Sequence, residues 1–187
     1  MIWVVIVVVA VAVLLLLFVV AMFNKLVRLR NRSENAWAQV DVQLKRRYDL
    51  VPNLVETVKG YAAHERETFE SVTKTRAAAQ AASAPADKAQ AENALTAALG
   101  KLIAVAEAYP QLRATENFQN LQNQLADIEQ KLAVSRQVYN DTVLTYGNAI
   151  QTVPTNIFAG LFNFRPREYF QTDDASRAAP QVSFTSS

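Results

Sequence analysis

Residues 2–23, IWVVIVVVAVAVLLLLFVVAMF, contain no charged side chain and no polar one. A helix of this length rises about 33 Å, which is enough to cross the roughly 30 Å hydrocarbon core of a bilayer. A cleaved secretory signal would need a basic start, a shorter apolar run and a small-residue cleavage site. The chain has no Lys or Arg before position 25, and Ala21-Met22-Phe23 is a poor cleavage site. The sequence therefore predicts a transmembrane anchor over residues 1–23.

Basic residues gather directly after the anchor, at Lys25, Arg28, Arg30 and Arg32. Flanking Lys and Arg favour the cytoplasmic side, so they predict an outward N-terminus and a helical domain in the cytoplasm. The same four charges suit contact with anionic lipid headgroups, at about 1 kcal/mol each. The net charge is +2. No block of like charge is long enough to indicate a nucleic-acid partner.

Beyond the anchor, no Gly or Pro interrupts residues 24–51, where apolar side chains recur every three or four positions. That spacing predicts an amphipathic helix continuous with the anchor. Pro52 removes a backbone donor and disfavours helical geometry at Val51, so a kink or a short interruption is expected there. Helical character then resumes and runs to about Ala82, which predicts a rod of roughly 90 Å.

Two further helices are expected after a turn at Ser83–Ala86. The first covers about residues 87–108 and ends at Tyr109-Pro110. The second covers about residues 116–152, with Thr115 as its N-cap. Its positions alternate spacings of three and four, which is the pattern of a heptad seam. The seam consists of Phe118, Leu121, Leu125, Ile128, Leu132, Ser135, Tyr139, Thr142, Tyr146 and Ala149. It fits a core seam within one bundle, which we favour, or a seam shared with a second copy.

Aromatic and basic residues concentrate after Pro154, which ends the helical region. The aromatic residues are Phe158, Phe162, Phe164, Tyr169 and Phe170, and Arg165 and Arg167 lie among them. The segment 153–170 either folds back as a strap over the bundle or forms an interfacial or oligomer contact, since aromatic and Arg side chains suit both. Residues 171–187 are polar and are expected to form a flexible tail.

Motifs for catalysis and for binding metals or cofactors are absent from the sequence. One His and no Cys leave little for a zinc site, and Thr68 stands where an H-E-x-x-H motif starting at His64 would need its second His. Four glycines cannot form a phosphate-binding or dinucleotide-binding loop. The run Lys45–Asp49 wraps its charges around a helix, so Arg46, Arg47 and Asp49 suit salt bridges within the bundle or between subunits. We therefore predict a non-enzymatic protein without cofactor, metal or nucleic acid.

Several stretches follow one another in a specific order: NKLVR (24–28), AWAQVDVQLKRRYDLVPNLV (36–55), VKGY (58–61), AEAYP (106–110) and YND (139–141). With His64-Glu65 and the segment from Pro154 to Phe170, they resemble the LemA family of bacterial membrane-anchored proteins. The resemblance implies a long antiparallel helical bundle behind one membrane helix, with no established enzymatic activity. Such proteins are often encoded near a membrane-associated zinc protease or a TPM-domain protein, which makes those two candidate partners. Some are lipoproteins with a domain outside the cytoplasm.

The sequence thus predicts an all-α chain with four parts: a single N-terminal transmembrane helix (1–23), a long antiparallel three- to four-helix bundle (24–152), an aromatic segment packed on the bundle or on a neighbour (153–170), and a tail (171–187). We hypothesise a membrane-anchored scaffold that assembles into a homo-oligomer at the bacterial inner membrane. The domain would face the cytoplasm, with the periplasm as the alternative. Candidate oligomer or partner contacts are Arg46, Arg47, Asp49, Phe158, Phe162, Phe164, Tyr169 and Phe170. Alternative functions are an adaptor or sensor for an envelope partner such as a membrane protease or a TPM-domain protein, and remodelling of membrane lipid.

Overall fold

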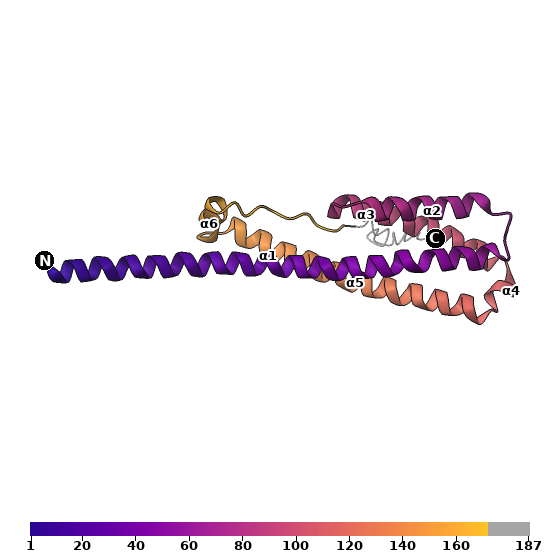
Figure 1. Ribbon diagram of the computed structural model, residues 1–187, viewed down its shortest axis with the longest axis horizontal. Helices are drawn as coiled ribbons and strands as arrows, with labels where there is room; N and C mark the ends of the chain where they lie inside the picture. The colour runs from indigo at the N-terminus through magenta and orange to yellow at the C-terminus, as the bar shows by residue number, and fades with distance from the viewer. Residues whose placement is uncertain (172–187) are drawn as a thin grey trace, which may run out of the picture. The chain divides into compact units, whose positions relative to one another are not determined.

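The computed structural model describes residues 1–171, and these residues form six helices and no β-strand. The helices are α1 (Ile2–Lys59), α2 (Arg66–Ala81), α3 (Pro85–Glu107), α4 (Pro110–Arg113), α5 (Glu116–Gln151) and α6 (Thr155–Leu161), as Figure 1 shows. The predicted all-α fold, with an apolar N-terminal helix and a helical bundle, is confirmed. The flexible tail expected from residue 171 lies outside the described residues, apart from Gln171.

Helix α1 joins the apolar segment to the first bundle helix in one run of 58 residues. Its apolar part is long and apolar enough to cross a membrane, and none of that part is buried against the rest of the described chain. The absence of Gly and Pro from residues 24–51 explains this continuity, because every residue there tolerates helical geometry. The predicted direct passage from anchor to bundle helix is confirmed.

Pro52 lies inside α1 and does not interrupt it, so the interruption expected there is wrong. A proline within a helix costs about 3 kcal/mol through its missing N–H and its clash with the preceding turn. Val51, Leu54 and Val55 are buried on either side of it. Each buried aliphatic side chain contributes about 1.5–3 kcal/mol, so the packing of these neighbours outweighs the local penalty.

The rod expected to reach Ala82 is also wrong, because α1 ends at Lys59. A turn over residues 60–65 follows, in which the amide of Ala62 donates to the Val58 carbonyl at 2.9 Å and the amide of Glu65 donates to the Ala62 carbonyl at 3.1 Å. Ala62 is buried within this turn. The chain then reverses into α2, so the helical pattern that continues past residue 60 belongs to two antiparallel helices.

The described chain divides into two compact units. The first contains residues 1–50 and 120–169, and the second contains residues 51–119 together with Phe170 and Gln171. The boundary between the units crosses both long helices, after residue 50 in α1 and before residue 120 in α5.

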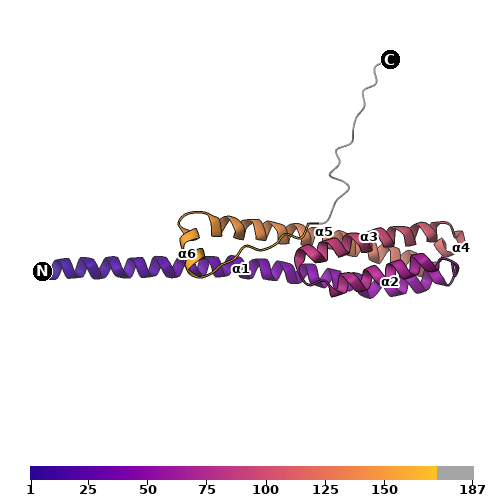
Figure 2. The same ribbon diagram turned by 90° about the horizontal axis from the view of Figure 1, so that it is seen from above.

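Helices α1 and α5 run antiparallel within the first unit (Figure 2). Arg47 of α1 contacts Glu129 of α5, Trp37 contacts Tyr139, and Leu26 packs with Tyr146 and Ile150. The position along α5 rises as the position along α1 falls, which is the register of an antiparallel pair. The seam predicted on α5 faces inward along its whole length, since all ten positions are buried or half-buried within the chain.

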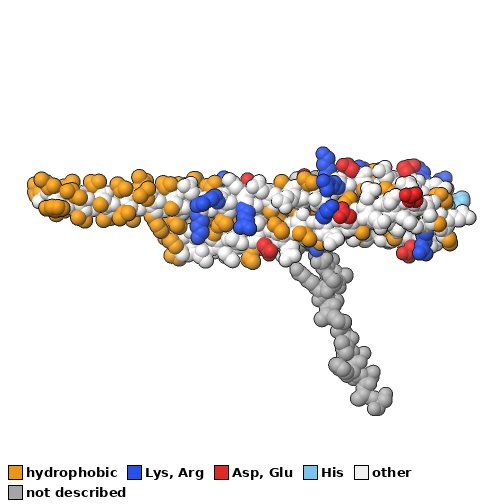
Figure 3. Space-filling view, turned by 90° about the horizontal axis from the view of Figure 1, so that it is seen from below, with side chains coloured by type: hydrophobic (Ala, Val, Ile, Leu, Met, Phe, Trp, Pro, Cys, Tyr) orange, Lys and Arg blue, Asp and Glu red, His pale blue; other side chains and the backbone are white. Residues whose placement is uncertain are grey.

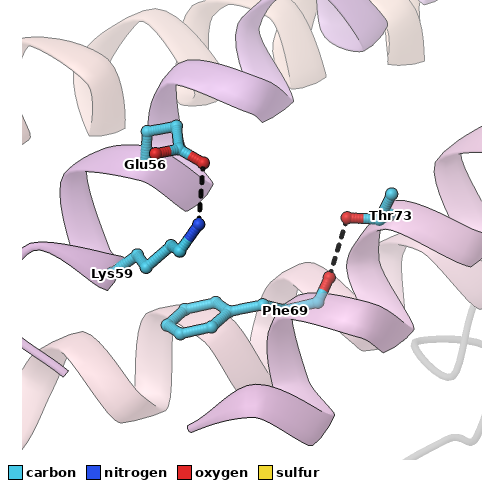
Figure 4. Close-up of polar contacts among 4 residues, drawn as sticks. All are labelled: Glu56, Lys59, Phe69 and Thr73. Atoms are coloured by element: carbon cyan, nitrogen blue, oxygen red, sulfur yellow. Dashed lines mark hydrogen bonds and ion pairs between the residues drawn. The ribbon is translucent and has the colours of Figure 1, made fainter. Parts of the chain in front are cut away.

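The second unit is built around the hairpin of α2 and α3. Helix α2 buries Phe69 and Val72, and α3 buries a stripe of leucines at positions 95, 99 and 102. At the chain reversal, Lys59 Nζ lies 3.5 Å from Glu56 Oε1, and Thr73 Oγ1 donates to the Phe69 carbonyl at 2.9 Å (Figure 4). Thr115 caps α5 as predicted, because its Oγ1 accepts the amide of Phe118 at 3.4 Å.

Candidate functional site

The C-terminal end of α5 and helix α6 form a small apolar core with α1 in the first unit. Leu26 of α1 packs there against Tyr146, Ala149 and Ile150 of α5 and against Ala159 of α6. Phe164, which follows α6, completes this core, and Val27, Leu29 and Phe158 pack against its edge. The α6 region is therefore fixed to the α1 turns that directly follow the apolar segment.

Three ring contacts extend this core onto the apolar segment of α1. Phe158 lies edge-to-face with Phe18, with ring centroids 6.0 Å apart. Phe23 lies in the same way against Phe162 at 4.9 Å and against Phe164 at 5.8 Å. Such pairs contribute about 0.5–1.5 kcal/mol each beyond the apolar area that they bury. Three of the aromatic residues singled out in the sequence thus pack on the anchor of their own chain.

Local hydrogen bonds fix both ends of α6. Thr155 is buried, and its Oγ1 lies within hydrogen-bond distance of the carbonyls of Thr152 and Ala149 at the end of α5. After α6 the chain reverses at Asn163, whose φ of 55° falls in the left-handed region that Asn tolerates better than most residues. The amide of Phe164 then donates to the Ala159 carbonyl at 2.9 Å.

An extended segment, residues 164–169, runs back along α1 and α5, and we call it the strap. Arg167 forms an ion pair with Glu34 of α1. Tyr139 of α5 donates its hydroxyl to the Glu168 carbonyl at 2.8 Å, and its ring lies 5.0 Å from that of Trp37. Burial raises the pKa of Tyr139 above its ordinary value, against the opposing effect of Arg167, so the phenol keeps the proton that it donates.

The four basic residues after the anchor, which we call the collar, are exposed: Lys25, Arg28, Arg30 and Arg32. The guanidinium of Arg30 lies 5.5 Å from the centre of the Phe164 ring, in cation–π contact. Beside it opens a surface depression of about 370 Å³, lined by Arg30, Tyr146, Asn163, Phe164, Pro166 and the arginines at 165 and 167. Figure 3 shows the basic side chains beginning where the apolar surface of the N-terminal helix ends.

Arg47, proposed as a salt-bridge residue, is buried, and its guanidinium lies 2.7 Å from Glu129 of α5. It therefore acts within the first unit. Arg46 and Asp49, the neighbouring candidates, are exposed. Of the candidates in the aromatic segment, Phe162 and Tyr169 keep substantial exposure, whereas Phe164 and Phe170 are buried.

A face of the first unit exposes apolar side chains beside shallow grooves between α1 and α5. Val138 lines one groove with Ala36 and Gln39 of α1. Val134 lines a second groove with Gln43 of α1 and Ser135 of α5. The described residues of this unit, 1–50 and 120–169, contain no third long helix besides α1 and α5. Buried beside the second groove, the side-chain oxygen of Gln43 has no hydrogen-bond partner within the described chain.

Among residues 1–171, no group of three or more His, Asp or Glu side chains lies close enough together to hold a metal ion. The carboxylates that the structure pairs instead serve ion pairs, such as Asp127 with Lys131 at 2.7 Å.

Phe18 and Phe23 are contact residues that the sequence did not reveal, because every side chain in the anchor is apolar and none stands out. A usable signal was present elsewhere. Residues 142–164 contain no Asp, Glu, Lys, Arg or His, so they form a second uncharged stretch. The structure places the end of this stretch, α6, against the end of the first one.

Comparison with known proteins supports the resemblance. Residues 36–184 match the sequence profile of the LemA family. Two proteins named magnetosome protein MamQ 1 and MamQ 2, both from Paramagnetospirillum magneticum, are 25% identical over 179 residues, covering 82% of this chain and 66% of each relative. Protein LemA of Metamycoplasma hominis is 23% identical over 157 residues, covering 82% of this chain and 71% of the relative. The match thus spans just under two thirds of the MamQ proteins.

Proposed function

The chain belongs to the LemA family, and from that premise we propose that it is a non-enzymatic, membrane-anchored scaffold that assembles with copies of itself. The contact surface is the grooved face of the first unit, which contains Val134 and Val138 of α5 and the facing residues of α1. Anchored copies share a two-dimensional membrane, which raises their effective concentration and favours lateral contacts along this face.

The exposed valines of the grooved face are the observation that carries the proposal. Val134 is 58% exposed and Val138 is 42% exposed, one helical turn apart on α5. Covering the remaining surface of each would contribute about 1 kcal/mol. Gln39, which is exposed and lines the first groove, offers a side-chain amide that can both donate to and accept from a second copy of the same face.

We also propose that the helical domain lies on the cytoplasmic side of a bacterial inner membrane. The collar follows the anchor directly, whereas no Lys or Arg precedes it. This asymmetry favours retention of the collar on the cytoplasmic side. The names of the relatives point to more than one cellular setting, since two are named for the magnetosome and one is not. A general scaffold role fits this range.

The test is the size of the detergent-solubilised full chain, measured by light scattering at micromolar concentration. The wild type should be a homo-oligomer. Val134→Glu with Val138→Glu removes about 2 kcal/mol of apolar burial per chain and places two carboxylates in the contact, where they must lose hydration. The dissociation constant should therefore rise by roughly thirtyfold or more.

Leu144→Glu is the matched control, because Leu144 is also an exposed apolar residue of α5 in the first unit. Around the axis of α5, at about 100° per residue, the Leu144 side chain points roughly 80° away from that of Val134 and roughly 120° away from that of Val138. It should leave the oligomer intact. A wild type that is monomeric at micromolar concentration would contradict the proposal, and a stoichiometric envelope protein copurifying with that monomer would favour the adaptor role.

A further inference from the structure

We propose that α6 is a second membrane-contacting element, an interfacial helix that lies in the bilayer beside the anchor. The proposal goes beyond self-assembly and does not depend on it. The occupant that we assign to the exposed face of α6 is the lipid of a bilayer with anionic headgroups. The argument rests on position, on surface chemistry and on the charges that surround the segment.

The position of α6 follows from its contact with Phe18. Phe18 precedes Lys25, the first charged residue after the anchor, by seven positions, which corresponds to about 10 Å along a helix. The Phe158 ring lies beside Phe18, with 6.0 Å between ring centroids. If the collar lies at the headgroups, Phe158 therefore lies about 10 Å deeper, and Phe162, which contacts Phe23 two positions before Lys25, lies about 3 Å deeper. Interfacial helices bury their apolar faces about 5–10 Å into the headgroup and acyl-chain boundary.

The outward face of α6 is apolar, whereas a helix that packs on a bundle in water usually has polar residues on its outward face. Its inward side chains are Thr155, Phe158 and Ala159, and the opposite face presents Ile157 and Leu161. Ile157 is 64% exposed and Leu161 is 73% exposed, and the flanking Val153 and Phe162 are also exposed. Apart from Thr155 and Asn156 in its first turn, α6 has no polar side chain. An outward apolar face of this kind is typical of a helix in a buried or membrane setting. Lipid would remove this surface from water.

The charge pattern around α6 agrees with its place in a bilayer. No charged residue occurs from position 142 to position 164, and Arg165 is the first to follow. Arg165 and Arg30 both line the depression beside Phe164. Arg30 of the collar and Arg165 of the strap therefore lie at one level of the first unit, on the side of α6 away from the start of the anchor. At that level they can contact lipid phosphates, at about 1 kcal/mol per charge.

The cysteine-free sequence allows a direct test in the full-length chain. Leu161→Cys is labelled with an environment-sensitive fluorophore, and the protein is reconstituted in vesicles of phosphatidylethanolamine and phosphatidylglycerol. Some vesicles carry a nitroxide near the headgroup end of the acyl chain, and others carry it near the methyl end. We expect a blue-shifted emission and several-fold stronger quenching by the shallow nitroxide than by the deep one.

Two control positions calibrate the measurement. Leu14→Cys lies 11 positions before Lys25, about 16 Å along the helix, and should be quenched more by the deep nitroxide. Val42→Cys, which is exposed on α1 ten positions after Arg32 and therefore about 15 Å beyond the collar, should be quenched weakly by both. Quenching of the Leu161 label no stronger than that of the Val42 label would overturn the proposal. A blue shift without quenching would place α6 against protein and would overturn it as well.

Discussion

Arg47 is a cation inside the first unit, where it is almost fully buried against α5. Its partner Glu129 is 41% exposed, so the pair lies at the edge of the apolar interior rather than in its centre. An ion pair in this position adds little net stability, because the loss of hydration opposes the attraction. Removal of the carboxylate alone is more damaging, since it takes the paired charge away from a guanidinium that stays buried.

This asymmetry predicts the order of stabilities in a small set of variants. Glu129→Gln should lower the free energy of unfolding by about 1–3 kcal/mol, because it removes one ion pair from a guanidinium that stays buried. Arg47→Met combined with Glu129→Gln should restore most of that loss, since Met fills a similar volume without a charge. Thermal unfolding of the full chain followed by circular dichroism ranks the variants. A double variant less stable than Glu129→Gln would show that Arg47 is needed for more than this pair.

At the scale of elements, local signals located most helix ends, and long-range packing decided the rest. Thr115 as an N-cap was readable because a cap is a local hydrogen bond. The continuation of α1 through Pro52 could not be read from the sequence, because the energetic penalty of the proline is outweighed by buried neighbours, and their burial depends on packing. The site was predictable in part. Its aromatic residues stood out as a group, but the pairing of Arg167 with Glu34 joins residues 133 positions apart, which no local pattern encodes.

Pro52 gives the prediction that belongs to the helix. Since α1 already has helical geometry there, Pro52→Ala should restore a backbone hydrogen bond and remove the clash with the preceding turn. We expect a stabilisation of about 1–3 kcal/mol, measured by urea or thermal unfolding. Pro85→Ala is the matched control, because Pro85 occupies the first turn of α3, where proline is tolerated. If both variants changed the stability equally, the penalty assigned to Pro52 would be wrong.

At the scale of the whole molecule, an uninterrupted α1 connects the membrane segment with both units. Residues 2–50 of this helix belong to the first unit, and the remaining nine belong to the second. The anchor and the bundle are therefore joined by continuous helical backbone and not by a flexible linker. If α6 also contacts lipid, the first unit is held to the bilayer at two segments that are far apart in the sequence.

We expect the charge asymmetry across the anchor to set the orientation of the chain in the membrane. Single cysteines at Ile2 and at Glu67, introduced separately, report its two sides, since both positions are exposed. In intact spheroplasts a membrane-impermeant maleimide should label Ile2→Cys and should leave Glu67→Cys unlabelled until the membrane is permeabilised. The reason is that Lys25, Arg28, Arg30 and Arg32 resist transfer across the membrane, whereas the uncharged N-terminal segment does not. Labelling of Glu67→Cys in intact spheroplasts would instead place the helical domain in the periplasm.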